Sequence, residues 1–399
     1  MDRTYLKKVN LKGYRTIKDL DAEFNPGLNL IIGKNGTGKT NFLTLLDGSL
    51  KFNLKDFFEA ESVLWFDGKS DIRLELASKN YLTGDSSNDF GYFDDLPTNI
   101  KVQYENELMD YNSSDEFKNS SYYSLVRTIN PILVPHGLRP DNVNKIISSS
   151  ASFKTKRNSI PDLIGIRRRD DTSYFLKSFN AGFSHLLLSA FYNREVDWNN
   201  PNQYYLETII QSYFEIVSDI LNKSISQYLP LKAVRISPSV KIYPDNSDGS
   251  IEIKDILMEF QIEDSWLPFS SLSDGTKRMF CIYADVIFPW NSGDDLSKAN
   301  KIILLEEPEL GVHPHQFEQI MTFLKEMSKD VQIILTTHSP QALDILGRDE
   351  LDALHICEYT PETGTTLTRL DKDQTGKAKA YMESDMYLSD YWRYSDLEK

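Results

Sequence analysis

The stretch that decides the fold is Gly33-Lys34-Asn35-Gly36-Thr37-Gly38-Lys39-Thr40. It fits the pattern G-x-x-x-x-G-K-S/T and lies between a mostly apolar run, residues 28–32, and an expected helix over residues 39–50. Glycines let backbone N–H groups turn inward around phosphate oxygens, and a helix N-terminus adds a field that favours an anion. The stretch therefore predicts a phosphate-binding loop.

Two side chains of this loop have individual roles in the prediction. We expect Lys39 to reach the β- and γ-phosphates of ATP and Thr40 to bind Mg²⁺. The other residues expected to bind the nucleotide from this segment are Gly33, Asn35, Gly36, Gly38 and Asn41. The alternative, a chance glycine-rich turn, is disfavoured because a buried strand precedes the loop and a helix follows it.

An acidic pair ends a second apolar run, Ile302 to Leu305. A strand end beside the phosphate-binding loop is where a magnesium ligand belongs, so we expect Glu306 to bind Mg²⁺ directly or through water. Glu307 is then the candidate general base that polarises the attacking water. The alternative interpretation is a solvated acidic turn after a core strand. The presence of a phosphate-binding loop in the same chain disfavours this interpretation.

Two shorter segments add candidate nucleotide contacts. Leu272-Ser273-Asp274-Gly275 precedes an expected helix, where a serine and a glycine can form an anion site, although Ser273 also fits a plain helix cap. Thr336-Thr337-His338-Ser339 follows another apolar strand, so His338 is placed to reach a γ-phosphate. A lone histidine is more often a packed or surface residue.

The rest of the chain predicts an α/β fold with an insertion. Residues 5–32 predict two antiparallel strands and a buried strand, with Tyr5, Val9 and Leu11 on one face and Leu6 on the other. Repeated strand–helix units over residues 301–345 predict a parallel core. Further strands are expected within residues 62–66, 72–76, 100–104, 233–243, 251–263, 351–359 and 365–370.

Helical spacing over residues 173–193 and 203–228 predicts an inserted helical hairpin, while residues 107–159 show no clear pattern. The expected domains are residues 1–105, the N-terminal half of an ATPase head; 106–230, a loop-rich and helical insertion; and 231–399, the C-terminal half with a helical tail.

Composition bounds the class of protein. The chain has 399 residues, is 40% apolar and carries a net charge of −15, so it is not a general binder of polyanions such as DNA. Cys281 and Cys357 match no metal or redox spacing and predict two reduced, buried thiols. Neither a secretory signal nor a run of about 20 apolar residues is present, so we expect a cytoplasmic protein without a membrane span.

Taken in order, the P-loop, LSDG, EEPELGVHP and TTHSP segments resemble those of ABC-type ATPases of the RecF, SMC and OLD group. The resemblance covers residues 1–50 and 265–345. It implies that Ser273 and Gly275 contact ATP held by another copy, that residues 310–314 form the D-loop, and that His338 is the switch histidine. Glu306 departs from the aspartate of many ABC proteins. Gln103 is a candidate for the Q-loop glutamine. Tyr14 and Arg15 are candidates for a nucleotide contact and fit equally well as ordinary strand residues.

The same resemblance implies a function. It implies a homodimer or larger homo-oligomer that binds and hydrolyses ATP head-to-tail. The chain shows no Toprim nuclease cluster after His338 and resembles ATPase subunits of bacterial anti-phage systems such as PARIS, Septu and those beside retrons. This implies control of a separate effector, such as a nuclease, in response to DNA or a phage protein. A transporter motor subunit is disfavoured.

The alternative is a RecF-like DNA repair or replication ATPase that binds duplex DNA. Its candidate DNA-binding residues are basic, and a solvated loop is the competing interpretation for them: Lys154, Lys156, Arg157, Arg167, Arg168 and Arg169.

Overall fold

A computed structural model describes residues 4–54, 57, 59–67, 71–78, 98–104, 107–120, 130–134, 151–155, 162–164, 203–236, 241–245, 250–288, 301–384 and 386–394. Contacts divide the chain into two compact units. Unit 1 comprises Met1–Pro135, Ala299–Glu309 and Met321–Lys399. Unit 2 comprises His136–Lys298 and Leu310–Ile320.

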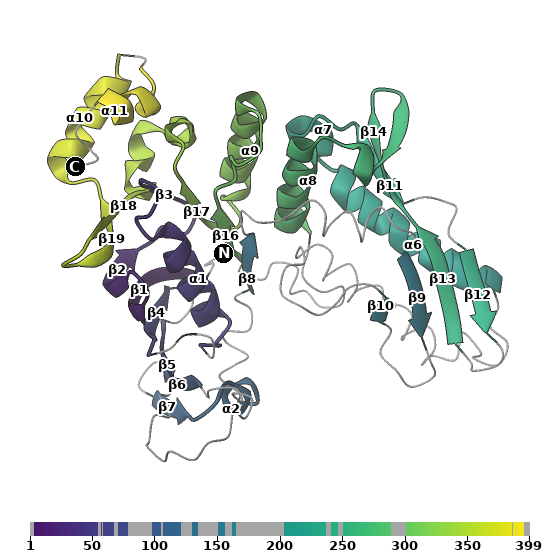
Figure 1. Ribbon diagram of the computed structural model, residues 1–399, viewed down its shortest axis with the longest axis horizontal. Coiled ribbons are helices and arrows are strands. Elements are labelled where there is room, and N and C mark those ends of the chain that lie inside the picture. Colours follow the sequence, from purple (N-terminus) through teal and green to yellow (C-terminus); the bar gives the residue numbers. More distant parts are fainter. Residues whose placement is uncertain are drawn as a thin grey trace. The chain divides into compact units, whose positions relative to one another are not determined.

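Unit 1 contains an antiparallel sheet with the strand order β2-β1-β4-β5-β6-β7 (Figure 1). Its strands are β1 (Tyr5–Tyr14), β2 (Ile17–Glu23), β4 (Glu61–Asp67), β5 (Ile72–Ser78), β6 (Thr98–Tyr104) and β7 (Glu107–Tyr111). Buried and more exposed residues alternate along β4 and β5, so one face of the sheet packs on the core and the other meets solvent. The expected antiparallel N-terminal strands are confirmed.

The predicted faces of β1 are wrong at its first two residues, Tyr5 and Leu6. Leu6, Val9 and Leu11 are all fully buried. In a regular strand, Leu6 and Val9 would lie on opposite faces, because they are three residues apart. A bulge explains this, because the register against β4 shifts between Leu6 and Lys8. One extra residue returns Leu6 to the core face.

The second sheet of unit 1 has the order β19-β18-β3-β17-β16-β8. Its strands are β3 (Leu28–Ile32), β8 (Asn130–Val134), β16 (Lys301–Glu306), β17 (Gln332–Thr337), β18 (Leu354–Thr360) and β19 (Gly364–Arg369). All neighbours pair in parallel except β18 and β19, which form an antiparallel hairpin. Every residue of β3, β16 and β17 is buried, as continuous apolar runs predict for a parallel sheet covered on both faces. The expected α/β fold with a parallel core is confirmed.

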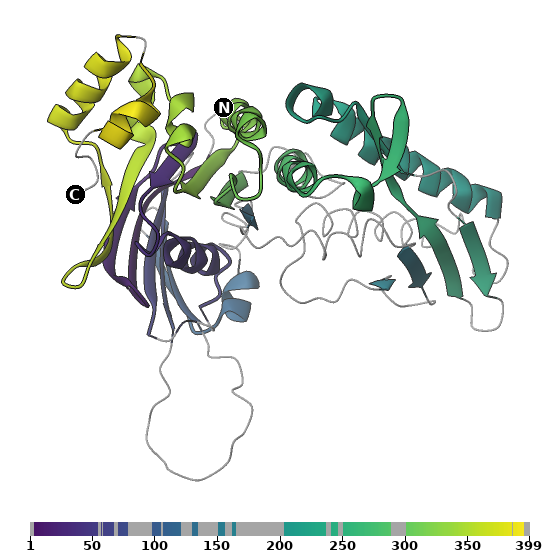
Figure 2. The same cartoon turned by 45° about the horizontal axis from the view of Figure 1, so that its top comes forward.

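Helix α1 (Lys39–Leu50) lies between the two sheets (Figure 2). Phe42, Leu45 and Leu46 on α1 are fully buried and belong to one apolar cluster with residues from both sheets. The sheet residues include Val9 and Leu64 from the antiparallel sheet and Ile31, Leu304 and Ile334 from the parallel one. Burial of each such side chain contributes about 1.5–3 kcal/mol, so α1 is fixed by packing on both sides.

One buried amide joins the two sheets. Gln332 at the start of β17 is 1% exposed. Its Nε2 donates to Leu6 O (2.9 Å) and Asn25 O (2.8 Å), and its Oε1 accepts from Leu6 N–H (2.9 Å). The side chain thus fixes β17 relative to the bulged start of β1.

The remaining elements of unit 1 are helical. They are α2 (Ser114–Lys118), the 3₁₀ segments η3 (Pro340–Ile345) and η4 (Arg348–Ala353), α10 (Lys372–Met382) and α11 (Leu388–Tyr394). Ser389 of α11 donates from its N–H and its hydroxyl to the Asp344 carboxylate, both at 2.8 Å, which holds the C-terminal helix against η3. Helix α9 (Pro314–Met327) belongs to unit 1 from Met321 onward.

Unit 2 combines two small sheets with helices (Figure 1). One sheet has the order β10-β9-β13-β12 and the other β11-β14-β15. The strands are β9 (Ala151–Thr155), β10 (Asp162–Ile164), β11 (Ala233–Ile236), β12 (Lys241–Asp245), β13 (Ser250–Ile256), β14 (Met258–Ile262) and β15 (Ser265–Pro268). The helices are α6 (Gln203–Asn222), α7 (Ile225–Tyr228), η1 (Phe269–Ser271) and α8 (Asp274–Ile287). The ribbon expected over residues 233–263 is therefore present, divided between the two sheets.

The division by contacts differs from the boundaries expected at 105/106 and 230/231, because β8 pairs with β16 in unit 1. The expected boundaries stay a prediction. The helical pattern over residues 203–228 is confirmed as α6 and α7, and that over 173–193 lies outside the described residues. No helix in the described part of the chain combines the length and the apolar character that crossing a membrane would require.

We expect Gln332→Ala to lower the free energy of unfolding by about 3 kcal/mol, because it leaves the backbone N–H and C=O of Leu6 and the C=O of Asn25 without this partner. Urea titration measures the change. The control is Gln103→Ala, since Gln103 is an exposed amide whose side chain meets Arg73 Nη1 at 3.4 Å. The control should change the free energy by less than about 0.5 kcal/mol. If Gln332→Ala lowers the free energy of unfolding by less than about 1 kcal/mol, Gln332 does not hold β17 to β1 as described.

Candidate nucleotide-binding site

The parallel register aligns the ends of three neighbouring strands. Thr337 of β17 stands opposite Ile32 of β3, and Thr336 opposite Glu306 of β16. The P-loop, Glu307 and His338 therefore follow the carboxyl ends of adjacent strands, where ligands bind in open α/β sheets. Helix α1, which begins at Lys39, also contacts β16. Residues far apart in the sequence thus gather at one edge of unit 1.

Glycines of the P-loop are required for two different reasons. Gly36 and Gly38 have φ angles of 85° and 98°, which disfavour any side chain. A Cβ on Gly33 would lie 2.3 Å from Cys357 O, and one on Gly38 would lie 2.1 Å from Thr365 Oγ1. Nothing lies within 4 Å of the corresponding position on Gly36. Backbone conformation alone therefore requires glycine at Gly36, and close packing adds to it at Gly38.

A small polar network supports the P-loop from behind. Thr365 Oγ1 of β19 donates to Thr37 O at 2.8 Å and lies 2.8 Å from Thr16 Oγ1. Thr16 accepts from Asn41 Nδ2 at 2.8 Å, and Asn41 Oδ1 accepts from Arg15 Nη1 at 3.3 Å. Asn41, expected to bind nucleotide, therefore also links α1 to the turn between β1 and β2.

The Lys39 amino group is folded back onto its own loop. Nζ donates to Gly33 O at 2.6 Å and to Lys34 O at 3.0 Å, and the residue is 5% exposed. These carbonyls hold the ammonium group beside the glycine turns. A charge held there is placed to exchange its carbonyl partners for phosphate oxygens.

The residues present fit a triphosphate with a divalent cation. Nothing lies within 4 Å of a Cβ built on Gly36, so the loop leaves open space at this glycine. Thr40 is exposed at the start of α1, and Glu306 is 5% exposed at the end of β16. A hydroxyl and a carboxylate are oxygen ligands of the kind that Mg²⁺ takes, together with phosphate oxygens.

The acidic turn and the histidine lie side by side. Glu307 has a φ of 44°, unusual for a residue with a side chain, and its N–H donates to Thr336 O at 2.9 Å. His338 Nδ1 lies 3.4 Å from Glu307 Oε1. A strained backbone of this kind costs of order 1–3 kcal/mol. The candidate base and the candidate switch histidine are therefore neighbours.

Glu309 joins this group, although no role was predicted for it. Its Oε1 accepts from Thr337 Oγ1 at 2.7 Å and from His338 N–H at 3.1 Å, and it lies 3.5 Å from His338 Nδ1. The signal that could have revealed it is the third acid of Glu306-Glu307-Pro308-Glu309 at the same strand end.

Ser273 and Gly275 belong to unit 2. Ser273 caps α8: its Oγ accepts from Thr276 N–H at 3.2 Å, and the residue is exposed. A Cβ on Gly275 would lie 3.0 Å from Gln316 Oε1 and 3.2 Å from Gly311 O, so this glycine packs closely on the segment expected to be the D-loop. The LSDG segment and the D-loop segment are thus one local structure.

The candidates Arg15 and Gln103 lie in different places. Arg15 lies beside Asn41, as described, with its guanidinium 5.1 Å from the Tyr14 ring centroid. Gln103 lies on the exposed face of β6, bonded to Arg73. Gln103 therefore lies on the solvent face of the sheet, opposite the core that packs on α1.

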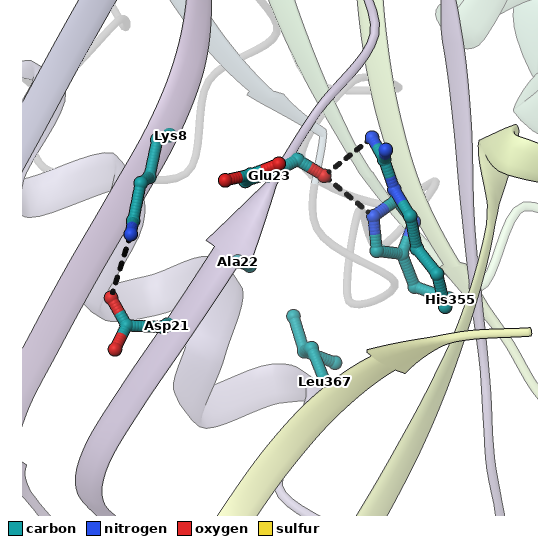
Figure 3. A pocket seen from close by; sticks show the side chains of 7 residues that line it. Lys8, Asp21, Ala22, Glu23, His355 and Leu367 are labelled. Carbon is teal, nitrogen blue, oxygen red and sulfur yellow. Dashed lines mark hydrogen bonds and ion pairs between the residues drawn. The ribbon is translucent and has the colours of Figure 1, made fainter. Parts of the chain in front are cut away.

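A separate pocket of about 260 Å³ contains none of the predicted site residues (Figure 3). His355 Nε2 lies 2.8 Å from Glu23 O, and Arg369 Nη2 donates to the same carbonyl at 2.9 Å. Burial lowers the pKa of His355 below its usual value. Lys8 and Asp21 form an ion pair at 3.7 Å in the same pocket. The polar groups that line the pocket therefore bond to one another or to the backbone, and these contacts account for their presence there.

Comparison with known families identifies this arrangement. Residues 28–344 match the family described as "AAA domain, putative AbiEii toxin, Type IV TA system". The chain belongs to this family. The match covers the P-loop, the LSDG segment, the acidic pair and His338, which are the segments that carried the expected ATPase resemblance.

Members of known systems are similar to this AAA domain protein along most of its length. Septu protein PtuA of Bacillus thuringiensis is 24% identical over 367 residues, covering 88% of this chain and 76% of that protein. The retron Vc95 probable ATPase of Vibrio cholerae is 19% identical, covering 89% of this chain and 74% of that protein. A RecF protein of Streptococcus uberis matches over only 39 residues, at 49% identity. The expected resemblance to Septu and retron-associated ATPases is confirmed.

Solved structures confirm the expected head fold. An SMC head domain from Pyrococcus furiosus, bound to the C-terminal domain of ScpA, aligns with a TM-score of 0.51 at 15% identity, covering 96% of this chain and 99% of that one. A second SMC head, bound to the C-winged helix domain of ScpA, aligns with a TM-score of 0.50 at 13% identity, covering 94% and 99%. At this identity the likeness shows the fold alone.

We expect Gly36→Ala to destabilise the nucleotide-free protein by about 1 kcal/mol, the cost of a positive φ. Gly38→Ala should cost about 3 kcal/mol, because the same backbone cost is joined by overpacking against Thr16 and Thr365. Urea titration of the two variants isolates the steric part. Equal losses of unfolding free energy in the two variants would show that Thr16 and Thr365 move aside without an energetic cost.

Proposed function

We propose that this protein hydrolyses ATP with Mg²⁺ at a site shared between two copies of the chain. The observation that carries the proposal is the convergence of the P-loop, Glu306-Glu307 and His338 at the ends of β3, β16 and β17. Strand ends arranged in this way place a phosphate cradle beside a carboxylate pair and an imidazole. Those are the groups that phosphoryl transfer to water requires.

Each residue has a defined part in the reaction. The P-loop backbone and Lys39 bind the phosphates, and Thr40 and Glu306 hold Mg²⁺, which neutralises charge on the phosphate oxygens. Glu307 accepts a proton from the attacking water as the water oxygen bonds to the γ-phosphorus and the bond to the β,γ-bridging oxygen breaks. His338, in the imidazolium form that carries an N–H on each ring nitrogen, donates a hydrogen bond from Nε2 to the γ-phosphate. Catalysis is by positioning and charge neutralisation, without a covalent intermediate.

The second copy completes the site through Ser273 and Gly275. Support comes from the exposed Ser273 hydroxyl at the N-terminus of the 14-residue helix α8, where a helix dipole favours an anion. The close packing of Gly275 on residues 311 and 316 joins this anion site to the D-loop segment. Two copies arranged head-to-tail then hold two ATP molecules, and hydrolysis lets them separate.

The proposed cellular role is regulation in a bacterial anti-phage defence system. Its support is the similarity to Septu protein PtuA and to the retron Vc95 probable ATPase over nearly nine-tenths of the chain. In this role the ATPase senses DNA or a phage protein and controls a separate effector protein, such as a nuclease. A RecF-like role in DNA repair is less supported, because the RecF match covers 10% of the chain.

Complementation tests the shared site. A Lys39→Ala copy cannot bind the phosphates of its own ATP. A Ser273→Arg copy cannot contact the ATP that its partner holds. We expect each variant alone to be inactive. An equimolar mixture should recover about a quarter of wild-type hydrolysis, because half of randomly formed dimers are mixed and each mixed dimer keeps one intact site of two. Phosphate release measures the recovery.

The matched control pairs two residues of the same half-site. Lys39→Ala mixed with Glu307→Gln should stay inactive, since every site then lacks either the lysine or the base. Rescue in this control, or its absence from the Lys39→Ala and Ser273→Arg mixture, would contradict the assignment. Glu307→Gln alone should still bind ATP in calorimetry, whereas Lys39→Ala should not.

The cellular role predicts a partner and a phenotype. Expressed with its neighbouring genes, the wild-type protein should lower phage plating at least about tenfold, and Lys39→Ala should abolish protection because nucleotide binding is lost. The product of an adjacent gene should co-purify with it. Salt-dependent binding to duplex DNA, lost when Arg167, Arg168 and Arg169 are changed to Glu, would instead favour the RecF-like role.

A further inference from the structure

Glu309 makes a set of contacts that a solvated acidic turn does not explain. Its side chain is 11% exposed. One oxygen, Oε1, accepts from the Thr337 hydroxyl and from the His338 N–H, and lies 3.5 Å from His338 Nδ1. All three contacts converge on two consecutive residues at the end of β17. The acidic turn after β16 is thereby tied to the segment that carries the switch histidine.

The hydrogen bonds through Thr337 have a fixed direction. Thr337 Oγ1 accepts from Ser339 N–H at 2.9 Å and therefore directs its own hydrogen toward Glu309 Oε1 at 2.7 Å. The backbone on both sides of His338 is thus held by the same carboxylate, directly at His338 and through Thr337 at Ser339. This restricts where the imidazole can point.

The second oxygen of Glu309 argues for a functional role. Oε2 is buried and accepts no hydrogen bond from the described part of the chain. A buried acceptor left in this state costs stability, which proteins tolerate mainly at functional sites.

His338 Nδ1 lies almost equally far from two carboxylates, 3.4 Å from Glu307 Oε1 and 3.5 Å from Glu309 Oε1. Both distances exceed the usual 2.7–3.2 Å, so a small rotation of the ring selects one partner. A single N–H at Nδ1 cannot serve both well. When it is directed to Glu309, it no longer competes with the attacking water for the Glu307 carboxylate.

We infer that Glu309 is a positioning residue for hydrolysis: it orients the His338 imidazole and draws the Nδ1–H away from the base Glu307. The inference rests on the proposed ATPase function. Glu309 acts through His338 and does not touch the phosphate. Removing it should therefore slow the chemical step and leave ATP binding intact.

Steady-state kinetics with a double-mutant cycle test this role. Glu309→Ala should lower kcat at least about tenfold and change KM for ATP less than about twofold. In the His338→Ala background the same substitution should lower kcat less than about twofold, because the group through which it acts is gone. Glu309→Gln, whose amide oxygen can still accept from Thr337 and His338, should keep kcat within about threefold of wild type.

A spectroscopic measurement reads the contact without ATP. The chain has six histidines, so ¹⁵N-labelled imidazole resonances can be assigned by substitution. Glu309→Ala should shift the His338 ring nitrogens in the nucleotide-free protein. The control Glu326→Ala should not, because Glu326 is a half-exposed acid of unit 1 that pairs with Lys329 at 2.7 Å. Should Glu309→Ala not fold, Glu309→Asp keeps the charge on a shorter arm and is expected to show the same shift and loss of kcat.

Defined outcomes overturn the inference. Equal losses of kcat in the wild-type and His338→Ala backgrounds, or a Glu309→Gln variant as impaired as Glu309→Ala, exclude positioning through the imidazole. The proposed ATPase function fails separately, if Glu307→Gln and His338→Ala leave hydrolysis unchanged. Loss of activity in those two variants with full activity in Glu309→Ala would overturn the role of Glu309 alone.

Discussion

The pairing of β17 with β3 on one side and β16 on the other is the interaction on which the rest of the structure depends. Parallel strands bring their carboxyl ends to one edge, so this register alone sets the P-loop, the acidic turn and His338 beside one another. A shift of β17 by one residue would exchange its buried faces and move His338 away from Glu307. The buried Gln332 side chain fixes this strand against β1 at the opposite end.

The three central strands of this sheet could be predicted from the sequence. The buried apolar runs before Gly33, Glu306 and His338 predict the core strands, because a parallel sheet covered on both faces needs continuous apolar residues. The turn chemistry of the P-loop is equally local, since positive φ angles at Gly36 and Gly38 demand glycine. Local signals therefore located both the fold and the three segments of the candidate site.

Features that depend on distant partners were not predictable in this way. The bulge that buries Leu6 arises from pairing with β4, more than fifty residues later. Strand β8 lies in a stretch without pattern and is defined by its pairing with β16. Glu309 could be recognised only when Thr337 and His338 were placed beside it. In each case the contact that decides the structure joins segments far apart in the sequence. Local patterns do not show that such segments are close in space.

The threonine behind the P-loop has a consequence for biosynthesis. Thr365 reaches the Thr37 carbonyl from a position 328 residues further along the chain. During translation the glycine loop emerges early, yet this support can form only after the β18–β19 hairpin has left the ribosome. A nascent or prematurely terminated polypeptide therefore carries a P-loop without its brace. The P-loop therefore gains this hydrogen bond only after the chain up to the end of β19 has been synthesised.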